Sequence, residues 1–266
     1  MRICTCIGVK LKQKGLVIRM RTIRDIAYGN CELKKLDIYL PEGEAKDVLI
    51  YFHGGGIEKG DKSTAENSAV YLTERAIAVV SANYRLYPTA VYPEFIRDAA
   101  AAVHWAYTHM KEYGCYENFY VGGSSAGAYL SMMLCFDKRY LAPYQIDPSQ
   151  LSGYIHNSGQ PTCHFNVLRE RGIDSRRVIV DEAAPLYHVG LAQTYPPMLF
   201  IGAENDIENR YEETMLMMST IKHFGHGDKT AFKLAPGGHC SYVRALDENG
   251  DSIFGKLIYE WLTDIR

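Results

Sequence analysis

Two adjacent serines lie in a run of small residues, "YVGGSSAGAYL", at positions 120–130. Ser125 has Gly123 two positions before it and Gly127 two positions after it, which gives the spacing Gly-x-Ser-x-Gly. Ser124 fits this spacing less well, because one of its two equivalent positions is an alanine. A serine held at a sharp strand-to-helix turn points to solvent, and the turn needs small residues at both flanking positions. The sequence therefore predicts Ser125 as a nucleophile, with Ser124 as a neighbour that packs or forms hydrogen bonds.

A serine hydroxyl is a weak nucleophile until a base takes its proton, and the chain has nine histidines. His239 lies in "APGGHCSY", in the turn after the last predicted strand, so it can reach the same edge of a sheet as Ser125. His53 ends a strand but precedes three glycines, which suggests a different role. The remaining histidines lie in or next to helices, in a strand or in an irregular segment. We expect His239 to be the base.

The carboxylate that orients the histidine should follow a strand between the serine and the histidine. The segment "FIGAEND" offers Glu204 and Asp206, and Asp206 comes after the turn has begun. Asp206 is the preferred candidate, Glu204 is the second and Asp181 in "VDEAAP" is the third. Asp206 has an alternative interpretation as a helix-capping residue for a segment that starts near position 209.

The tetrapeptide "HGGG" at positions 53–56 follows a buried apolar run. Glycines allow unusual backbone angles and let a ligand approach the main chain closely. We expect the backbone N–H groups of Gly55 and Gly56, together with that of Ala126, to stabilise an oxyanion. His53 and Gly54 would then support the shape of this loop.

Strands alternate with helices after residue 47, which is typical of a mostly parallel sheet covered on both faces. An antiparallel pair of strands precedes this region. The predicted strands are 23–29, 35–41, 47–53, 77–83, 118–123, 151–159, 196–206 and 230–236, and the predicted helices are 63–75, 94–113, 125–136, 209–224 and 251–264.

We interpret residues 21–266 as one α/β domain with a lid insertion at about 160–195. Residues 1–20 are basic and suit neither a strand nor a helix well, so we expect a loosely attached extension. Segments 57–62, 85–92, 160–195 and 207–211 are the expected walls of a substrate pocket.

Composition excludes several classes of function. The net charge is -2 and no Lys- or Arg-rich run occurs, so nothing favours a nucleic-acid partner. No apolar run approaches the roughly 20 residues of a membrane span. The seven cysteines include no Cys-x-x-Cys pair, which favours reduced thiols in a cytoplasmic protein without a metal site. The oligomeric state has no signal in the sequence.

The chain order serine, aspartate, histidine is that of the α/β-hydrolase fold. The sequence resembles α/β-hydrolase esterases of the hormone-sensitive-lipase-like and the carbohydrate- or feruloyl-esterase-like groups. The resemblance extends over residues of about 20–266, and its motifs are "YFHGGG", "SANYRLYP", "VGGSSAGAYL", "PPMLFIGAEND" and "GGHCSY".

The resemblance implies cofactor-independent hydrolysis of a carboxylic ester by Ser125, His239 and Asp206. It also implies a structural role for Arg85 in "NYRL". The hormone-sensitive-lipase group carries an Asp where Ser124 stands here, and it has a sizeable N-terminal cap. These departures favour a smaller acetyl- or feruloyl-esterase-like enzyme acting on short-chain or carbohydrate-linked esters. The alternatives are a serine peptidase of the same fold and a non-catalytic homologue that binds a ligand.

Overall fold

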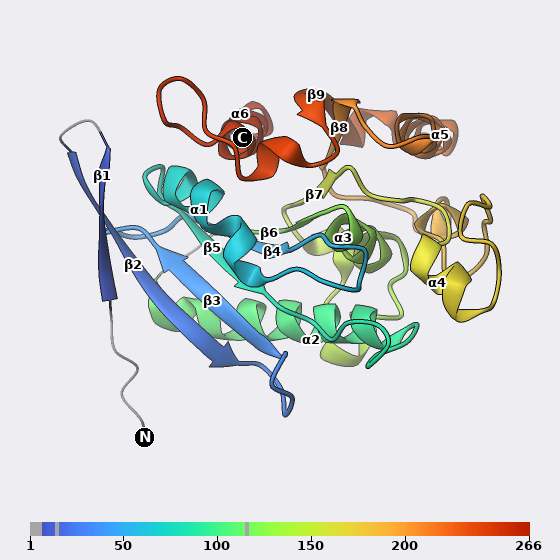
Figure 1. Cartoon of the computed structure of the whole chain (residues 1–266), viewed down its shortest axis with the longest axis horizontal. Helices are drawn as coiled ribbons and strands as arrows, with labels where there is room; N and C mark the ends of the chain where they lie inside the picture. The colour runs from blue at the N-terminus through green and yellow to red at the C-terminus, as the bar shows by residue number, and fades with distance from the viewer. Residues whose placement is uncertain (1–6, 14–15, 115–116) are drawn as a thin grey trace.

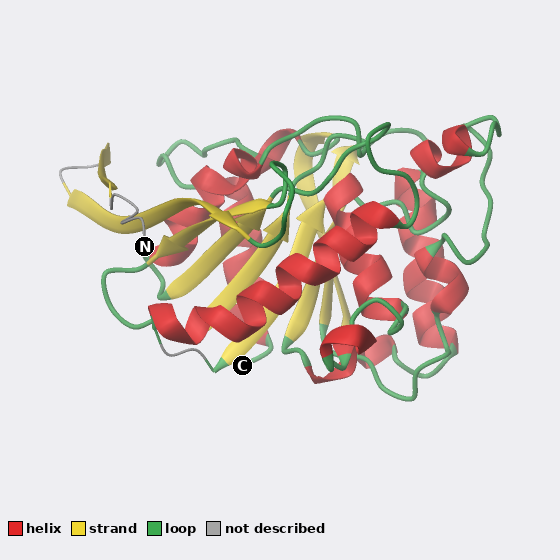
Figure 2. Ribbon diagram, turned by 90° about the horizontal axis from the view of Figure 1, so that it is seen from below, coloured by secondary structure: helices red, strands yellow, loops and turns green. Residues whose placement is uncertain are grey.

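The structure, a computed structural model, describes residues 7–13, 16–114 and 117–266. The described residues form one twisted sheet of nine strands in the order β1-β2-β3-β5-β4-β6-β7-β8-β9 (Figures 1 and 2). The strands are β1 (Ile7–Gln13), β2 (Leu16–Ala27), β3 (Lys35–Leu40), β4 (Asp47–Phe52), β5 (Ile77–Ala82), β6 (Asn118–Ser124), β7 (Gly153–Asn157), β8 (Met198–Asn205) and β9 (Thr230–Gly238).

Strands β1, β2, β3 and β5 pair antiparallel, and the pairs from β5 through β4 to β9 are all parallel. A parallel strand packed on both faces consists of apolar residues on both sides. The central strands β4 and β5 follow this rule, because each has all six residues buried. The expected α/β-hydrolase fold with a mostly parallel sheet is therefore confirmed.

Helices cover both faces of the sheet (Figures 1 and 2). Helices α1 and α6 contribute to the apolar cluster on one face, and α2, α3 and α5 contribute to the cluster on the other. The bounds of the helices are α1 (Glu66–Thr73), α2 (Glu94–His109), α3 (Ala126–Phe136), α4 (Phe165–Glu170), α5 (Arg210–His223) and α6 (Ile253–Asp264). None of the helices in the described residues is long and apolar enough to cross a membrane.

The first twenty residues differ from the expectation in one respect. We expected no regular structure there, but Ile7–Gln13 forms β1 and the beginning of β2 lies opposite it. Among the described residues, β1 pairs with β2 alone, and β2 pairs with β3 from Arg21 onward. The hairpin therefore continues the sheet at its outer edge, beyond the strands that carry the core (Figure 1).

Candidate active site

Ser125 occupies the turn between β6 and α3. Its backbone has a φ of 53° and a ψ of -114°, a conformation that side-chain-bearing residues rarely adopt. Such strain costs on the order of 1–3 kcal/mol and persists only where the surrounding structure imposes it. The turn is tight on both sides, because a Cβ atom on Gly123 would lie 2.3 Å from the Gly127 backbone and one on Gly127 would lie 2.0 Å from the Phe52 carbonyl oxygen.

The structure brings Ser125, His239 and Asp206 into one line of hydrogen bonds. Asp206 follows β8 and His239 follows β9, so both side chains lie at the carboxyl edge of the sheet. His239 Nδ1 is hydrogen-bonded to Asp206 Oδ1, and Nε2 lies 2.8 Å from Ser125 Oγ. A carboxylate only accepts hydrogen bonds, so Nδ1 carries a proton, and Nε2 is the nitrogen placed to accept the proton of the serine hydroxyl. This is the geometry that a general base requires.

The Asp206 carboxylate is held by three further donors. Ser158 Oγ donates to Oδ2 at 2.8 Å, and the backbone N–H groups of Ala203 and Ile207 donate to Oδ2 and Oδ1 at 3.3 and 2.8 Å. Burial raises the pKa of this carboxyl group, but the hydrogen bonds from His239, Ser158 and Ile207 outweigh burial and lower the pKa overall. Asp206 is therefore ionised in the folded protein at neutral pH.

Ser158 was not among the residues predicted from the sequence. It follows β7 directly, at the same edge of the sheet as the other site residues, and has a φ of 48°. Its position after a central parallel strand was the only sequence signal, and many residues share that signal.

Ser124 lies beside the nucleophile candidate but has a different environment. Its side chain is buried, and its Oγ accepts hydrogen bonds from Tyr51 Oη at 2.7 Å and from Asn157 Nδ2 at 2.6 Å. Tyr242 Oη in turn donates to Asn157 Oδ1. These contacts fix the inner side of the turn, and they leave Ser125 as the serine whose hydroxyl meets the imidazole.

The glycine loop after β4 lies against the turn. Gly55 and Gly56 have φ values of 119° and 67°, which favour glycine. In the described part of the chain, the N–H groups of Gly55, Gly56 and Ala126 have no hydrogen-bond acceptor. The N–H of Ser125 itself donates to the Asn157 carbonyl oxygen at 2.7 Å and is not available.

His53 is buried and does not reach Ser125 through a hydrogen bond. Its ring stacks on Tyr84 with a centroid distance of 4.5 Å, and its Nδ1–H donates to the Gly54 carbonyl oxygen at 2.8 Å. Tyr84 Oη donates to the His53 carbonyl oxygen at 2.9 Å. Burial lowers the pKa of His53, so the ring is neutral and braces the loop.

Arg85 forms ion pairs with α2. Its guanidinium donates to Asp98 from Nε at 2.7 Å and from Nη2 at 2.9 Å, and Nη1 donates to Glu94 at 3.1 Å. These bonds fix the loop after β5 to the helix and direct the side chain away from the cleft beside Ser125.

The alternative carboxylates lie elsewhere. Glu204 is exposed and accepts from the Gly237 N–H at 3.4 Å. Asp181 pairs with Arg171 at 2.6 Å and accepts from Cys163 Sγ at 3.0 Å. Neither forms a hydrogen bond with His239, so the structure brings only Asp206 of the three candidates to the histidine.

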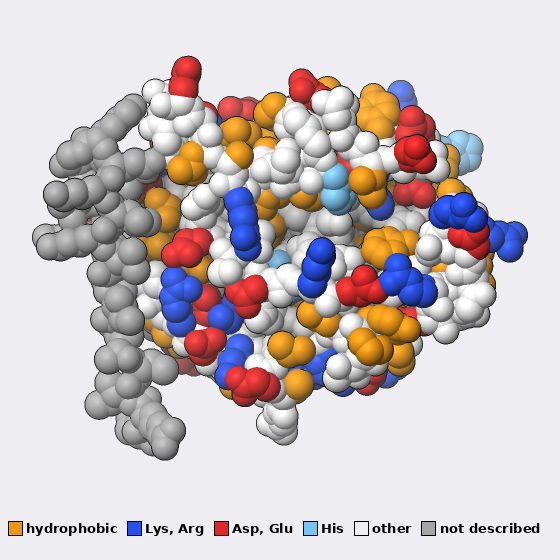
Figure 3. All heavy atoms as spheres, viewed as in Figure 1, with side chains coloured by type: hydrophobic (Ala, Val, Ile, Leu, Met, Phe, Trp, Pro, Cys, Tyr) orange, Lys and Arg blue, Asp and Glu red, His pale blue; other side chains and the backbone are white. Residues whose placement is uncertain are grey.

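A cleft of about 610 Å³ opens beside Ser125 and His239. The segments 57–62, 160–195 and 207–211 contribute to its walls as expected, but 85–92 does not. The fourth wall comes from the chain after His239. Besides the glycine loop, Ser125 and His239, the lining of the cleft includes Glu58, Lys59, Thr64, Phe165, Ile207, Arg210, Val243 and Arg244. Figure 3 shows this face of the molecule, with Lys and Arg side chains around a hollow near its centre.

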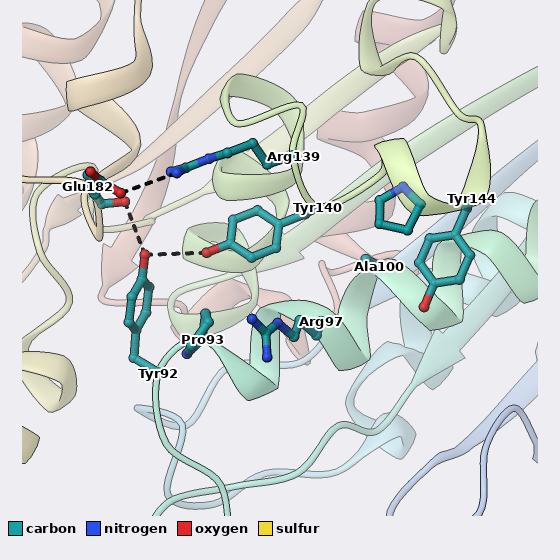
Figure 4. A pocket seen from close by; sticks show the side chains of 9 residues that line it. Tyr92, Pro93, Arg97, Ala100, Arg139, Tyr140, Tyr144 and Glu182 are labelled. Carbon is teal, nitrogen blue, oxygen red and sulfur yellow. Dashed lines mark hydrogen bonds and ion pairs between the residues drawn. The ribbon is translucent and has the colours of Figure 1, made fainter.

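A second cavity, of about 510 Å³, lies at the amino-terminal end of α2 (Figure 4). Tyr92 belongs to this cavity, and its Oη donates to the Glu182 carbonyl oxygen at 3.1 Å. Tyr140 Oη donates to Tyr92 Oη at 3.3 Å, and Arg139 pairs with the Glu182 carboxylate. Tyr92 is thus the residue of the loop 85–92 that lines this second cavity, which shares no residue with the cleft beside Ser125.

Part of the chain is similar in sequence to a known protein family and to curated proteins. The family model described as BD-FAE matches residues 36–167. A kynurenine formamidase from Danio rerio is 33% identical over 119 residues, which are 43% of this chain and 39% of the relative. The carboxylic ester hydrolase LipN from Mycobacterium tuberculosis is 39% identical over 122 residues, which are 44% of this chain and 32% of the relative. The chain thus spans well under half of these curated relatives.

Solved structures match over a larger part of the chain. Esterase B from Lactobacillus rhamnosis has a TM-score of 0.73 at 18% sequence identity, and the match covers 92% of this chain and 85% of the other. An esterase from Thermogutta terrifontis has a TM-score of 0.72 at 19% identity, with 91% of each chain covered. At these identities the likeness concerns the fold.

Proposed function

We propose that this chain is a serine carboxylesterase of the α/β-hydrolase family of esterases and lipases. The observation that carries the proposal is the hydrogen-bonded line from Ser125 Oγ through the His239 ring to the Asp206 carboxylate, at the edge of a cleft. The substrates are short-chain or carbohydrate-linked esters.

In the proposed mechanism, Ser125 Oγ attacks the ester carbonyl carbon while His239 Nε2 takes the hydroxyl proton. The carbonyl oxygen becomes an oxyanion, which the N–H groups of Gly55, Gly56 and Ala126 stabilise. His239 then gives its proton to the leaving alcohol as the C–O bond breaks. Water, activated by the same histidine, releases the acid and restores Ser125. Asp206 holds the imidazole in the required tautomer and stabilises its charged form.

The supporting roles follow from the geometry of the site. His53, Gly54 and Tyr84 support the glycine loop, and Arg85 ties the loop after β5 to α2. Gly123 and Gly127 allow the tight turn, since neither position has room for a side chain.

Hydrolysis of p-nitrophenyl acetate, butyrate and octanoate tests the proposal. We expect hydrolysis of the shorter esters, and a loss of about 10⁴-fold or more in kcat in the Ser125→Ala variant, because the nucleophile is absent. The chain-length profile measures the size of the acyl pocket. A wild-type protein that is no faster than Ser125→Ala would contradict the proposal.

Amide hydrolysis is the second candidate, because one of the similar proteins is a kynurenine formamidase. A formanilide and a peptide p-nitroanilide, assayed beside the esters, separate the two reactions. Faster turnover of an amide than of every ester would favour a formamidase or peptidase, and binding without turnover of either class would favour a non-catalytic homologue.

A further inference from the structure

Arg210 is a buried cation in the wall of the cleft. It is the first residue of α5, its exposed fraction is 6%, and it lines the same cleft as Ser125 and His239. Phe165 and Ile207 are the apolar residues of the wall on this side. Arginine is rarely buried in proteins unless it is paired.

The guanidinium of Arg210 is not satisfied by the protein. Within the described residues, its Nε and Nη1 atoms are buried and have no hydrogen-bond acceptor. The Glu213 carboxylate lies 3.6 Å from Nη1, beyond hydrogen-bonding distance, and its other oxygen accepts from Thr162 Oγ1 at 2.9 Å. A buried donor without an acceptor costs about 1–3 kcal/mol, and a charged group costs more.

The position on the helix adds to this cost. The amino-terminal end of an α-helix carries a partial positive charge, so a cation there is unfavourable and an anion is favourable. Burial also lowers the pKa of Arg210, since it disfavours the charged form. The carboxylate paired with Arg210, that of Glu213, forms no hydrogen bond with it, so the guanidinium keeps unsatisfied donors.

The rest of the cleft is also positive. Lys59 and Arg244 line it, and neither forms an ion pair within the described part of the chain. Glu58 is the carboxylate in this wall, and it is already paired with Arg169. A ligand with a negative charge would meet two cations of the cleft, Lys59 and Arg244, that no carboxylate of the described residues pairs with.

We propose that the ester substrate carries a carboxylate group, which Arg210 binds in the cleft beside Ser125. The inference rests on the proposed esterase function and names its substrate class. The planar guanidinium matches a carboxylate with two parallel hydrogen bonds, which a lysine does not provide.

Two pairs of esters that differ in one carboxylate test the inference. Monoethyl adipate is compared with ethyl hexanoate for a carboxylate on the acyl group, and 4-acetoxybenzoate with phenyl acetate for a carboxylate on the alcohol. We expect the anionic ester of at least one pair to have a kcat/KM about tenfold or more above its neutral partner. This preference should fall by about tenfold in Arg210→Met, mainly through KM, because a charged hydrogen-bonded pair is lost.

Further variants separate binding from folding and from overall charge. Arg210→Met leaves Glu213 without its cation, so the double variant Arg210→Met/Glu213→Gln is measured as well and should show the same loss of preference. Arg210→Lys keeps the positive charge but lacks the planar guanidinium, so it should keep only part of the preference for the anionic ester. Lys222→Met removes an exposed charge from the last turn of α5 and should leave the preference unchanged.

The outcomes distinguish the two proposals. Equal rates within both pairs, or a preference that persists in the double variant, would overturn the inference while the esterase function stands. Failure of the wild type to hydrolyse any of the four esters would instead overturn the esterase function, and the inference with it.

Discussion

At the scale of single residues, two glycines decide whether the turn at Ser125 can form. Gly127 lies in the first turn of α3, where alanine would have the better helix propensity by about 1 kcal/mol. Its neighbours reverse that preference, because a Cβ atom would lie 2.0 Å from the Phe52 carbonyl oxygen and 2.7 Å from that of His53. Both contacts are to backbone atoms, which cannot move without disturbing β4 and the glycine loop.

We therefore expect Gly127→Ala to lower the free energy of unfolding by at least about 2 kcal/mol, as overpacking of a filled site does. Urea unfolding followed by tryptophan fluorescence measures the change. Gly43→Ala is the matched control, since a Cβ there meets nothing within 4 Å and its effect should be close to zero. Equal stability of the two variants would show that the turn tolerates a side chain.

The residues predicted from the sequence were those with a local pattern. Ser125 has its flanking glycines, and His239 and Asp206 each follow a strand. Ser158 also follows a strand, but many residues do, and its importance depends on its contact with Asp206, which is distant in the sequence. Arg210 has no local pattern, because its importance depends on donors that lack an acceptor. The proposed roles of all five stay predictions until the variants are measured.

At the scale of elements, the central strands were predictable because parallel strands are buried on both faces and appear as continuous apolar runs. Strand β1 was missed because it pairs with only one neighbour at the outer edge. Its sequence, "IGVKLKQ", alternates apolar and polar residues instead of forming such a run.

The walls of the cleft were also predicted only in part from the sequence. Loop 85–92 was expected to border the cleft, but its Arg85 pairs with Asp98 and Glu94 of α2, and its Tyr92 lines the second cavity. Long-range ion pairs of this kind leave no periodic signal in the sequence. The segment 160–195 does reach the cleft, through Phe165 at the start of α4, but its action as a lid stays a prediction.

At the scale of the whole molecule, the core contains histidines that are neutral because they are buried. Burial lowers the pKa of His156 to about 3 and that of His164 to about 3, with nearby Arg210 and Arg169 adding to the effect at His164. In the unfolded chain a histidine has a pKa of about 6.5. Below that pH the unfolded chain binds a proton at each position and the folded protein does not, so each histidine lowers stability as the pH falls from about 6.5 towards 3.

We expect this effect to appear as a difference between the wild type and His156→Phe. From pH 7.5 to pH 5.0, the wild type should lose more free energy of unfolding than the variant, by up to about 1.4 kcal/mol per pH unit below 6.5. Urea unfolding at pH 7.5, 6.0 and 5.0 measures both proteins. The wild type and the variant share their carboxylates, so the effect of carboxylate titration cancels in the comparison. Parallel dependence of the free energy of unfolding on pH in the two proteins would contradict the assignment of a neutral buried His156.

Covalent labelling with a fluorophosphonate addresses the central proposal most directly, because only an activated serine displaces fluoride from phosphorus at a useful rate. We expect one label per folded chain, mapped to Ser125 by tandem mass spectrometry of the peptide that also contains Ser124. The label should persist in Ser124→Ala when that variant is folded, and be absent from Ser125→Ala. A folded wild-type protein that stays unlabelled, or that carries the label on Ser124, would contradict the assignment of Ser125 as the nucleophile.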